Sequence, residues 1–166
     1  MTVSAESGTA SPALTVTAVV INFNGGERVL KALASLLHQG PSLSGIVVVD
    51  NRSDDGSPQR IRERFPGVRL IELHENVGLS AARNIALRNL RSTLALLVDH
   101  DIYLEAGSLD RMMAAYAEYR PAIVCPRIRL VPERDVVQTD GAYLHFLGTL
   151  GLRNAYSRAA EVPARP

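Results

Sequence analysis

The sequence predicts an α/β fold: an open, mostly parallel sheet with helices on both faces. Short apolar runs rich in β-branched residues alternate along the chain with segments of helical periodicity. The runs are apolar throughout, which is typical of strands buried on both faces in a parallel sheet whose crossovers are right-handed. Polar clusters follow several of these strands, at the carboxyl ends where open α/β sheets bind ligands.

Composition limits the classes of protein. The chain has 166 residues, 46% of them hydrophobic, and a net charge of +1, enough for one domain with a real core. With no basic block and few aromatic residues, we expect no nucleic-acid partner. The single cysteine, Cys125, cannot form an internal disulfide, and its apolar neighbours predict a buried strand residue in a reducing compartment.

The N-terminal segment 1–14 is rich in Ser, Thr and Ala and lacks both a basic start and an apolar core, so we interpret it as a disordered leader and not a signal peptide. No apolar run is long enough for a transmembrane segment. We therefore expect a cytoplasmic protein. Peripheral membrane contact and a homo-oligomer stay open.

The first half of the chain predicts a strand–helix–strand unit. A strand over 17–23 ends at the turn residues 24–26, and a second strand covers 46–49. The helix between them begins at Glu27 and ends before Gly40-Pro41. Five apolar residues are expected on its buried face: Val29, Leu30, Leu33, Leu36 and Leu37.

Two more strands are expected over 68–73 and 94–98, the latter a run of five buried apolar residues. Three helices separate and follow these strands: Ser57 caps one that ends near Phe65, Ser80 caps one over 81–90, and Ser108 caps one that ends at Tyr119. The second of these helices offers three residues for packing, namely Ile85, Leu87 and Leu90. Beyond 122–126, short strands at 128–131 and 136–137 indicate a hairpin.

The acidic triplet Asp99-His100-Asp101 ends the strand over 94–98 and allows two interpretations. In the first, both carboxylates are solvated loop residues; in the second, they hold a hard divalent cation, Mg²⁺ or Mn²⁺, that bridges to a substrate diphosphate. The second interpretation is favoured because the other polar clusters also follow strands. These clusters are Asn22–Asn24, Asp50–Asp55 and His74–Asn76.

Four motifs in this order resemble those of family 2 glycosyltransferases, which have the GT-A fold. They are VVINFNG at 19–25, IVVVDNRSDDGS at 46–57, ENVGLSAARNIAL at 75–87 and LLVDHD at 96–101. Two later segments, CPRI at 125–128 and VVQTDG at 136–141, resemble rhamnosyltransferase-like members. The resemblance implies a truncated GT-A sheet: a nucleotide-sugar-binding core over 15–131 and a partial acceptor-side extension over 132–166.

The resemblance also implies roles for individual residues. Phe23 matches an aromatic residue that stacks on the base, although a core phenylalanine is the alternative. Asp50 matches a carboxylate that accepts a hydrogen bond from the base, and Arg83 matches an arginine that contacts base or phosphate. Asp54 and Asp55 are interpreted as turn residues.

The acidic triplet matches the family's Asp-x-Asp motif. Asp101 is the expected direct ligand of Mn²⁺ or Mg²⁺, and Asp99 is expected to bind the metal, the ribose or a bridging water. The full set of expected nucleotide-sugar-binding residues is Asn22, Phe23, Asn24, Asp50, Asn76, Arg83, Asp99 and His100.

The activity implied by the resemblance is inverting transfer of a sugar from a nucleotide-diphosphate sugar to an acceptor hydroxyl, the acceptor being unknown. No general base is identified, because neither Glu133 nor Asp140 has the expected context. The chain could therefore be a fragment, a compact member whose acceptor site comes from another chain, or a nucleotide-sugar-binding domain without catalysis. A nucleotidyltransferase and a dinucleotide dehydrogenase are disfavoured, since the first strand is not followed by the glycine-rich loop of either.

Overall fold

The computed structural model describes residues 14–144 and 150–163, and the predicted leader lies almost wholly outside them. Contacts divide the chain into two compact units, up to Leu109 and from Asp110 onward. This division falls earlier than the expected boundary at 131. The functions assigned to the two parts stay predictions.

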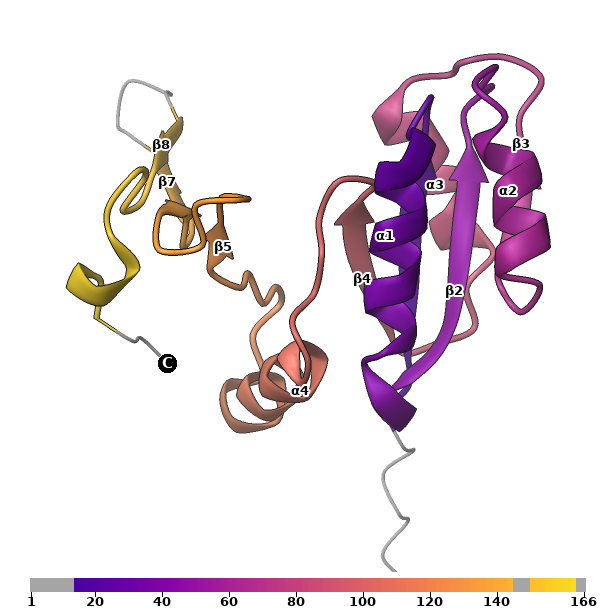
Figure 1. The fold of residues 1–166 in the computed structure, drawn as a ribbon. Coiled ribbons are helices and arrows are strands. Elements are labelled where there is room, and N and C mark those ends of the chain that lie inside the picture. The colour runs from indigo at the N-terminus through magenta and orange to yellow at the C-terminus, as the bar shows by residue number, and fades with distance from the viewer. Residues whose placement is uncertain (1–13, 145–149, 164–166) are drawn as a thin grey trace, which may run out of the picture. The chain divides into compact units, whose positions relative to one another are not determined.

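Unit 1 contains a parallel sheet in the order β3-β2-β1-β4, as the apolar runs predict (Figure 1). Its strands are β1 (Val16–Asn22), β2 (Leu43–Asp50), β3 (Arg69–Glu72) and β4 (Leu94–Asp99). Its helices are α1 (Gly26–Leu37), the short 3₁₀ helix η1 (Gly40–Ser42), α2 (Ser57–Arg64) and α3 (Leu79–Arg88). Since β2 and β3 lie on one side of β1 and β4 lies on the other, strand order reverses between β1 and β4. Open α/β sheets bind ligands at such a reversal.

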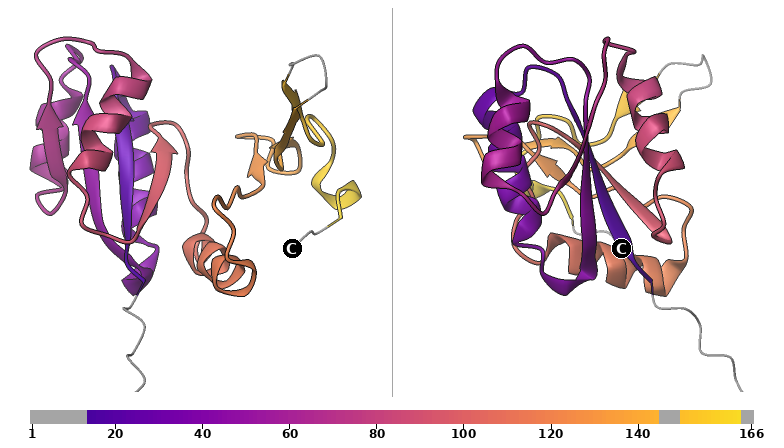
Figure 2. Two further views of the ribbon diagram at one scale, coloured as in Figure 1. Left: turned by 180° about the vertical axis from the view of Figure 1, so that it is seen from behind. Right: turned by 90° about the vertical axis from the view of Figure 1, so that its right-hand side faces the viewer.

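Helices cover both faces of this sheet, as expected (Figure 2, right view). On one face, Leu33 of α1 and Ile61 of α2 pack with Val20 and Val48 in the larger core cluster. On the other face, α3 packs mainly against β1 and β2, and its small buried residues are Ala82 and Ala86. Alternate residues of the two central strands therefore supply both cores, which explains why those strands are continuously apolar.

Several expected buried residues are exposed in the structure. Leu37 is 57% exposed because it ends α1 beyond the stripe that faces the sheet. Leu87 of α3 is 39% exposed, since alanines one turn apart take the sheet-facing positions. In β4 only Val98 is buried and Leu97 is 48% exposed, because β4 is an edge strand of the described sheet.

Two helix starts differ from the prediction. Gly56 precedes α2 and Gly78 precedes α3, both with positive φ, so Ser57 lies inside its helix and Ser80 is not a cap. Glycine adopts such a backbone without the steric cost of a Cβ atom. The side chains of the asparagines and serines in these turns therefore do not cap the helices and can make other hydrogen bonds.

Unit 2 contains small antiparallel pairs. Helix α4 (Ser108–Tyr119), which begins at the end of unit 1, ends at Tyr119 as expected, and the predicted cap Ser108 is its first residue. The expected hairpin is confirmed by β5 (Ile128–Arg129) pairing with β6 (Val137–Thr139). A second pair and a short 3₁₀ helix follow: β7 (Ala142–Leu144), β8 (Leu150–Leu152) and η2 (Ala159–Glu161).

One expectation for this unit is wrong. Cys125 is exposed and unpaired within irregular chain, because the apolar residues at 122–126 form no strand. Among the described residues of both units, none belongs to a helix that has both the length and the apolarity to cross a membrane.

Candidate functional site

Strand register brings the predicted polar residues to one edge of the sheet. Asn22 pairs with Asp50, Asp50 pairs with Glu72, and Asp99 pairs with Ile21, so all three carboxyl-terminal residues of the neighbouring strands are level with the end of β1. Asp50 and Asp99 lie on either side of β1, two strand spacings apart, or about 10 Å. The acidic triplet and the β1 loop therefore flank the point where strand order reverses.

Asn22 is the centre of a buried hydrogen-bond network. Its side chain is fully buried, and its amide nitrogen donates to Asp50 Oδ1 at 2.7 Å and to Ser57 Oγ at 2.8 Å. A longer bond of 3.1 Å reaches Ser53 Oγ, and the amide oxygen accepts from the Gly25 backbone at 3.2 Å. Asn22 thus has no exposed group for a ligand and instead positions its neighbours.

Asp50 is 2% exposed, and its carboxylate is held by three hydrogen bonds. Besides Asn22, Ser53 donates from its hydroxyl at 2.6 Å to the same oxygen and from its backbone N–H at 2.9 Å to Oδ2. Neutral donors on both oxygens fix the orientation of the carboxylate. The sequence did not single out Ser53, since nothing local indicates which residue of the turn faces Asp50.

The turn after β2 is tied to the β1 loop. Asn24 accepts from the Asp54 N–H through its side chain and donates its own N–H to Ser53 Oγ, both at 2.9 Å. Asp55 accepts from the Gly26 N–H at 2.8 Å and from the hydroxyl and N–H of Ser57. The interpretation of Asp54 and Asp55 as turn residues is confirmed.

Asp55 has a shifted pKa. Partial burial raises it, but the hydrogen bonds from Ser57 and Gly26 and the positive charge of Arg60 together outweigh burial and lower the pKa of this carboxyl below its usual value. The ionised form of Asp55 therefore stabilises the folded turn.

A second asparagine, Asn51, ties the loop after β3 to the same edge. Its side chain is 3% exposed, donates to Asn76 Oδ1 at 2.7 Å and accepts from the Val77 N–H at 2.9 Å. Asn76 Oδ1 also accepts from the Gly78 N–H at 2.9 Å. These contacts account for Asn76 as a loop-positioning residue and bring in Asn51, which the sequence did not single out.

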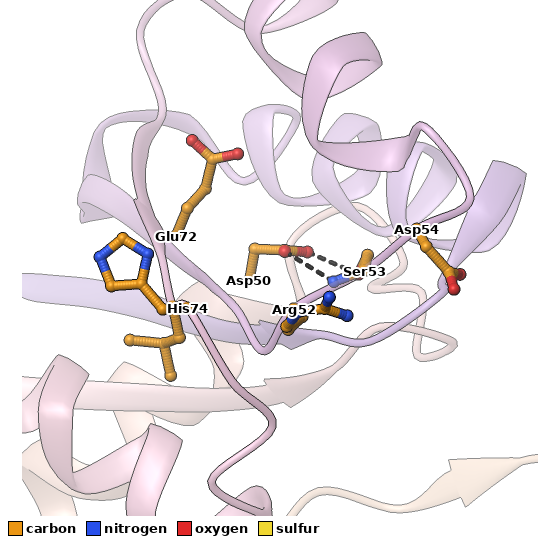
Figure 3. A pocket seen from close by; sticks show the side chains of 7 residues that line it. Asp50, Arg52, Ser53, Asp54, Glu72 and His74 are labelled. Carbon is orange, nitrogen blue, oxygen red and sulfur yellow. Dashed lines mark hydrogen bonds between the residues drawn. The ribbon is translucent and has the colours of Figure 1, made fainter.

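A shallow pocket of about 440 Å³ opens beside Asp50 (Figure 3). It lies between the ends of β2 and β3 and is lined by Asp50, Arg52, Ser53, Asp54, Glu72, Leu73 and His74. Figure 3 shows Glu72 and His74 on the opposite side of Asp50 from Asp54. Of the predicted site residues, only Asp50 lines this pocket. Arg52 and His74 belong to polar clusters predicted at strand ends, although neither was named as a site residue. Glu72 was not predicted, because its approach depends on the register of β3.

Phe23 follows β1 directly and is 46% exposed. The alternative of a core phenylalanine is therefore excluded. The ring is accessible at the reversal of strand order, next to Asn22.

The acidic triplet forms a turn, in which the Ile102 N–H donates to the Asp99 backbone carbonyl at 3.0 Å. Asp101 is exposed and His100 half-buried. Arg83 of α3 donates to Asp99 Oδ1 at 2.5 Å, and the two side chains are 30% and 53% exposed. The structure thus brings Arg83 and Asp99 together, on the opposite side of β1 from Asp50.

Carboxylate oxygens suit Mg²⁺ or Mn²⁺, and the triplet supplies them. No group of three or more His, Cys, Asp or Glu side chains within the described ranges is arranged to hold a metal by itself. A small divalent cation is commonly held by one or two carboxylates and completed by phosphate oxygens, so this donor set fits a metal that arrives with a diphosphate.

Comparison with known families decides the class of the chain. The sequence model of glycosyl transferase family 2 matches residues 17–155, which include the whole edge described above. The chain belongs to glycosyl transferase family 2. The resemblance noted in the sequence is therefore confirmed at the level of the family.

Two named proteins are similar to this family 2 chain. Succinoglycan biosynthesis protein ExoO of Rhizobium meliloti (strain 1021) is 32% identical over 132 residues, which cover 79% of this chain and 36% of ExoO. The N-acetylglucosaminyl-diphospho-decaprenol L-rhamnosyltransferase of Mycobacterium tuberculosis (strain ATCC 25618 / H37Rv) is 26% identical over 123 residues, 67% of this chain and 40% of that protein. The family 2 chain thus spans less than half the length of either relative.

Solved structures show the same fold. S. aureus TarS 1-349 superposes with a TM-score of 0.66 at 23% identity, over 78% of this chain and 40% of TarS. The mannosyltransferase PcManGT from Pyrobaculum calidifontis superposes with a TM-score of 0.54 at 26% identity, over 70% of this chain and 35% of its own. The prediction of an open parallel sheet of the GT-A type is confirmed.

Proposed function

We propose that this chain is the donor-binding part of a metal-dependent, inverting glycosyltransferase that uses a nucleotide-diphosphate sugar. The observation that carries the proposal is the sheet edge: a pocket beside Asp50 and a carboxylate turn at Asp99–Asp101 flank the reversal of strand order. Related structures support it, since TarS has been solved with UDP and with UDP-GlcNAc, and PcManGT with GDP-Man and Mn²⁺.

In this proposal the β2 side of the edge binds the nucleoside. Asp50 accepts a hydrogen bond from the base, because an ionised carboxylate can only accept. Phe23 offers its exposed ring for stacking. Three asparagines do not contact the ligand but hold Asp50 and the surrounding loops through internal hydrogen bonds. They are Asn22, Asn24 and Asn76.

The β4 side binds the diphosphate. Asp101 and Asp99 would hold Mn²⁺ or Mg²⁺, which when bound supplies positive charge to the departing nucleoside diphosphate. Arg83 donates to phosphate oxygens, for which a planar guanidinium is well suited. His100 is proposed as a further polar contact. An acceptor hydroxyl would attack the anomeric carbon from the opposite face, and we assign no general base to Glu133, Asp140 or any other residue.

The test is a binding screen followed by a turnover assay. Thermal shift with UDP, GDP and dTDP, with and without Mn²⁺, should show saturable stabilisation by at least one nucleotide that grows with Mn²⁺; at 100 times the dissociation constant it amounts to about 2.7 kcal/mol. Asp50→Ala should remove the nucleotide-dependent shift, while Glu63→Ala, an exposed residue of α2, should keep it.

Hydrolysis or transfer of the corresponding nucleotide sugar then separates two functions. Turnover supports the glycosyltransferase. Tight binding without turnover supports a binding domain or an incomplete catalytic unit. Absence of stabilisation by every nucleotide would remove the proposal altogether.

A further inference from the structure

The ion pair between Arg83 and Asp99 occupies one of the two carboxylates proposed to receive a cation. Arg83 Nη2 lies 2.5 Å from Asp99 Oδ1, and the contact joins α3 to the end of β4. We propose that Arg83 is a placeholder: it neutralises Asp99 in the cation-free protein and moves to the diphosphate when the metal and nucleotide bind. This inference rests on the proposed function.

Asp50 and Asp99, the two carboxylates at the sheet edge, have different hydrogen bonds, and the difference favours exchange at Asp99. Asp50 is buried and bonded on both oxygens to Asn22 and Ser53. Asp99 is half exposed, and its described side-chain partner is one nitrogen of one arginine. A single-point ion pair at a solvent-accessible edge is weak, so a divalent cation can replace the guanidinium at Asp99 at little cost.

Charge favours the exchange. A guanidinium and a divalent cation on the same carboxylate repel each other, so the metal binds Asp99 more tightly when Arg83 leaves. The released guanidinium stays close to the bound phosphates, to which it can make two parallel hydrogen bonds. Arg83 should therefore oppose binding of the metal alone and favour binding of the nucleotide with the metal.

The measurable consequence is that loss of Arg83 should strengthen binding of the metal alone and weaken binding of the nucleotide with the metal. Free Mn²⁺ is followed by electron paramagnetic resonance during titration of the protein, first without nucleotide and then with UDP or GDP. Without nucleotide, Arg83→Gln should bind Mn²⁺ about three- to tenfold more tightly than the unchanged protein, the size expected for removing a weak ion pair and a nearby like charge. With Mn²⁺ present, the same variant should bind the nucleotide about tenfold more weakly.

Three further variants test whether the change in Mn²⁺ affinity comes from the contact between Arg83 and Asp99. Arg88→Gln, at the exposed end of the same helix, removes the same charge away from Asp99 and should leave Mn²⁺ affinity unchanged. Arg83→Lys keeps the charge but loses the planar fork, so it should weaken nucleotide binding without the gain in Mn²⁺ affinity. In the background of Asp99→Asn, Arg83→Gln should no longer tighten Mn²⁺ binding. Circular dichroism of every variant checks that the fold is kept.

The outcomes separate this inference from the proposed function. Mn²⁺ binding by Arg83→Gln that is equal, weaker or undetectable without nucleotide overturns the placeholder, even where metal-dependent nucleotide binding persists. Failure of the unchanged protein to bind any nucleotide overturns the proposed function. The nucleotide-free titration still decides in that case whether Arg83 blocks a cation at Asp99.

Discussion

The two sides of the carboxyl edge are built differently. On the β2 side, Asn22, Asp50 and Asn51 are almost fully buried and joined by short hydrogen bonds to the loops around them. On the β4 side, Asp101 is exposed and Asp99 is held by one half-buried arginine. Buried, fully bonded polar groups keep a fixed geometry, whereas exposed charges rearrange at little cost. The β2 side, which we propose binds the base, is thus preformed, and the β4 side is left to be organised by its proposed ligand.

The largest effect on stability is expected from Asn22→Leu. The substitution keeps a similar volume but leaves Asp50, Ser57 and the Gly25 N–H without their buried partner. Unsatisfied buried polar groups cost about 1–3 kcal/mol each, so we expect a loss of about 3 kcal/mol in the free energy of unfolding. Urea unfolding followed by circular dichroism measures it.

Asn84→Ala is the matched control, because Asn84 is exposed on α3. It should change the free energy of unfolding by no more than about 0.5 kcal/mol. Equal effects of the two substitutions would mean that the β2 side is not a preformed network.

Only part of this edge could be predicted from the sequence. The strands and their polar ends were predictable, because apolar runs and turn residues are local signals. The network was not, since the side-chain partners of Asn22 come from 28 to 35 residues away and depend on strand register. Exposure of Leu97 was missed for a similar reason: a local pattern does not tell whether β4 is central or at an edge.

A smaller effect is expected from Asp55, which joins the network at its exposed margin. Its pKa is lowered in the folded protein, so its ionised form stabilises the fold above the unfolded pKa of about 3.9, and this contribution is lost as pH falls through the folded value. Asp55→Asn keeps an acceptor oxygen but cannot ionise. The variant should lose stability less steeply on acidification below about pH 4.

Stability of Asp55→Asn measured by urea unfolding from pH 6 down to pH 3 tests this. Asp54→Asn is the control, because the described contact of Asp54 to the β1 loop uses its backbone N–H. A curve for Asp55→Asn parallel to that of the unchanged protein would show that the Asp55 charge does not hold the turn.

The smallest effect on stability is expected at Asp101. Asp101 is exposed in the turn after β4, so Asp101→Ala should change the free energy of unfolding by no more than about 0.5 kcal/mol. The same variant should lose the Mn²⁺-dependent part of the nucleotide thermal shift, because a hard cation loses a carboxylate ligand. If the β4 side is organised only when its ligand binds, Asp101 should affect ligand binding and not the stability of the fold. An unchanged Mn²⁺-dependent shift would exclude Asp101 as a ligand, and a large loss of stability would show that the β4 side is as preformed as the β2 side.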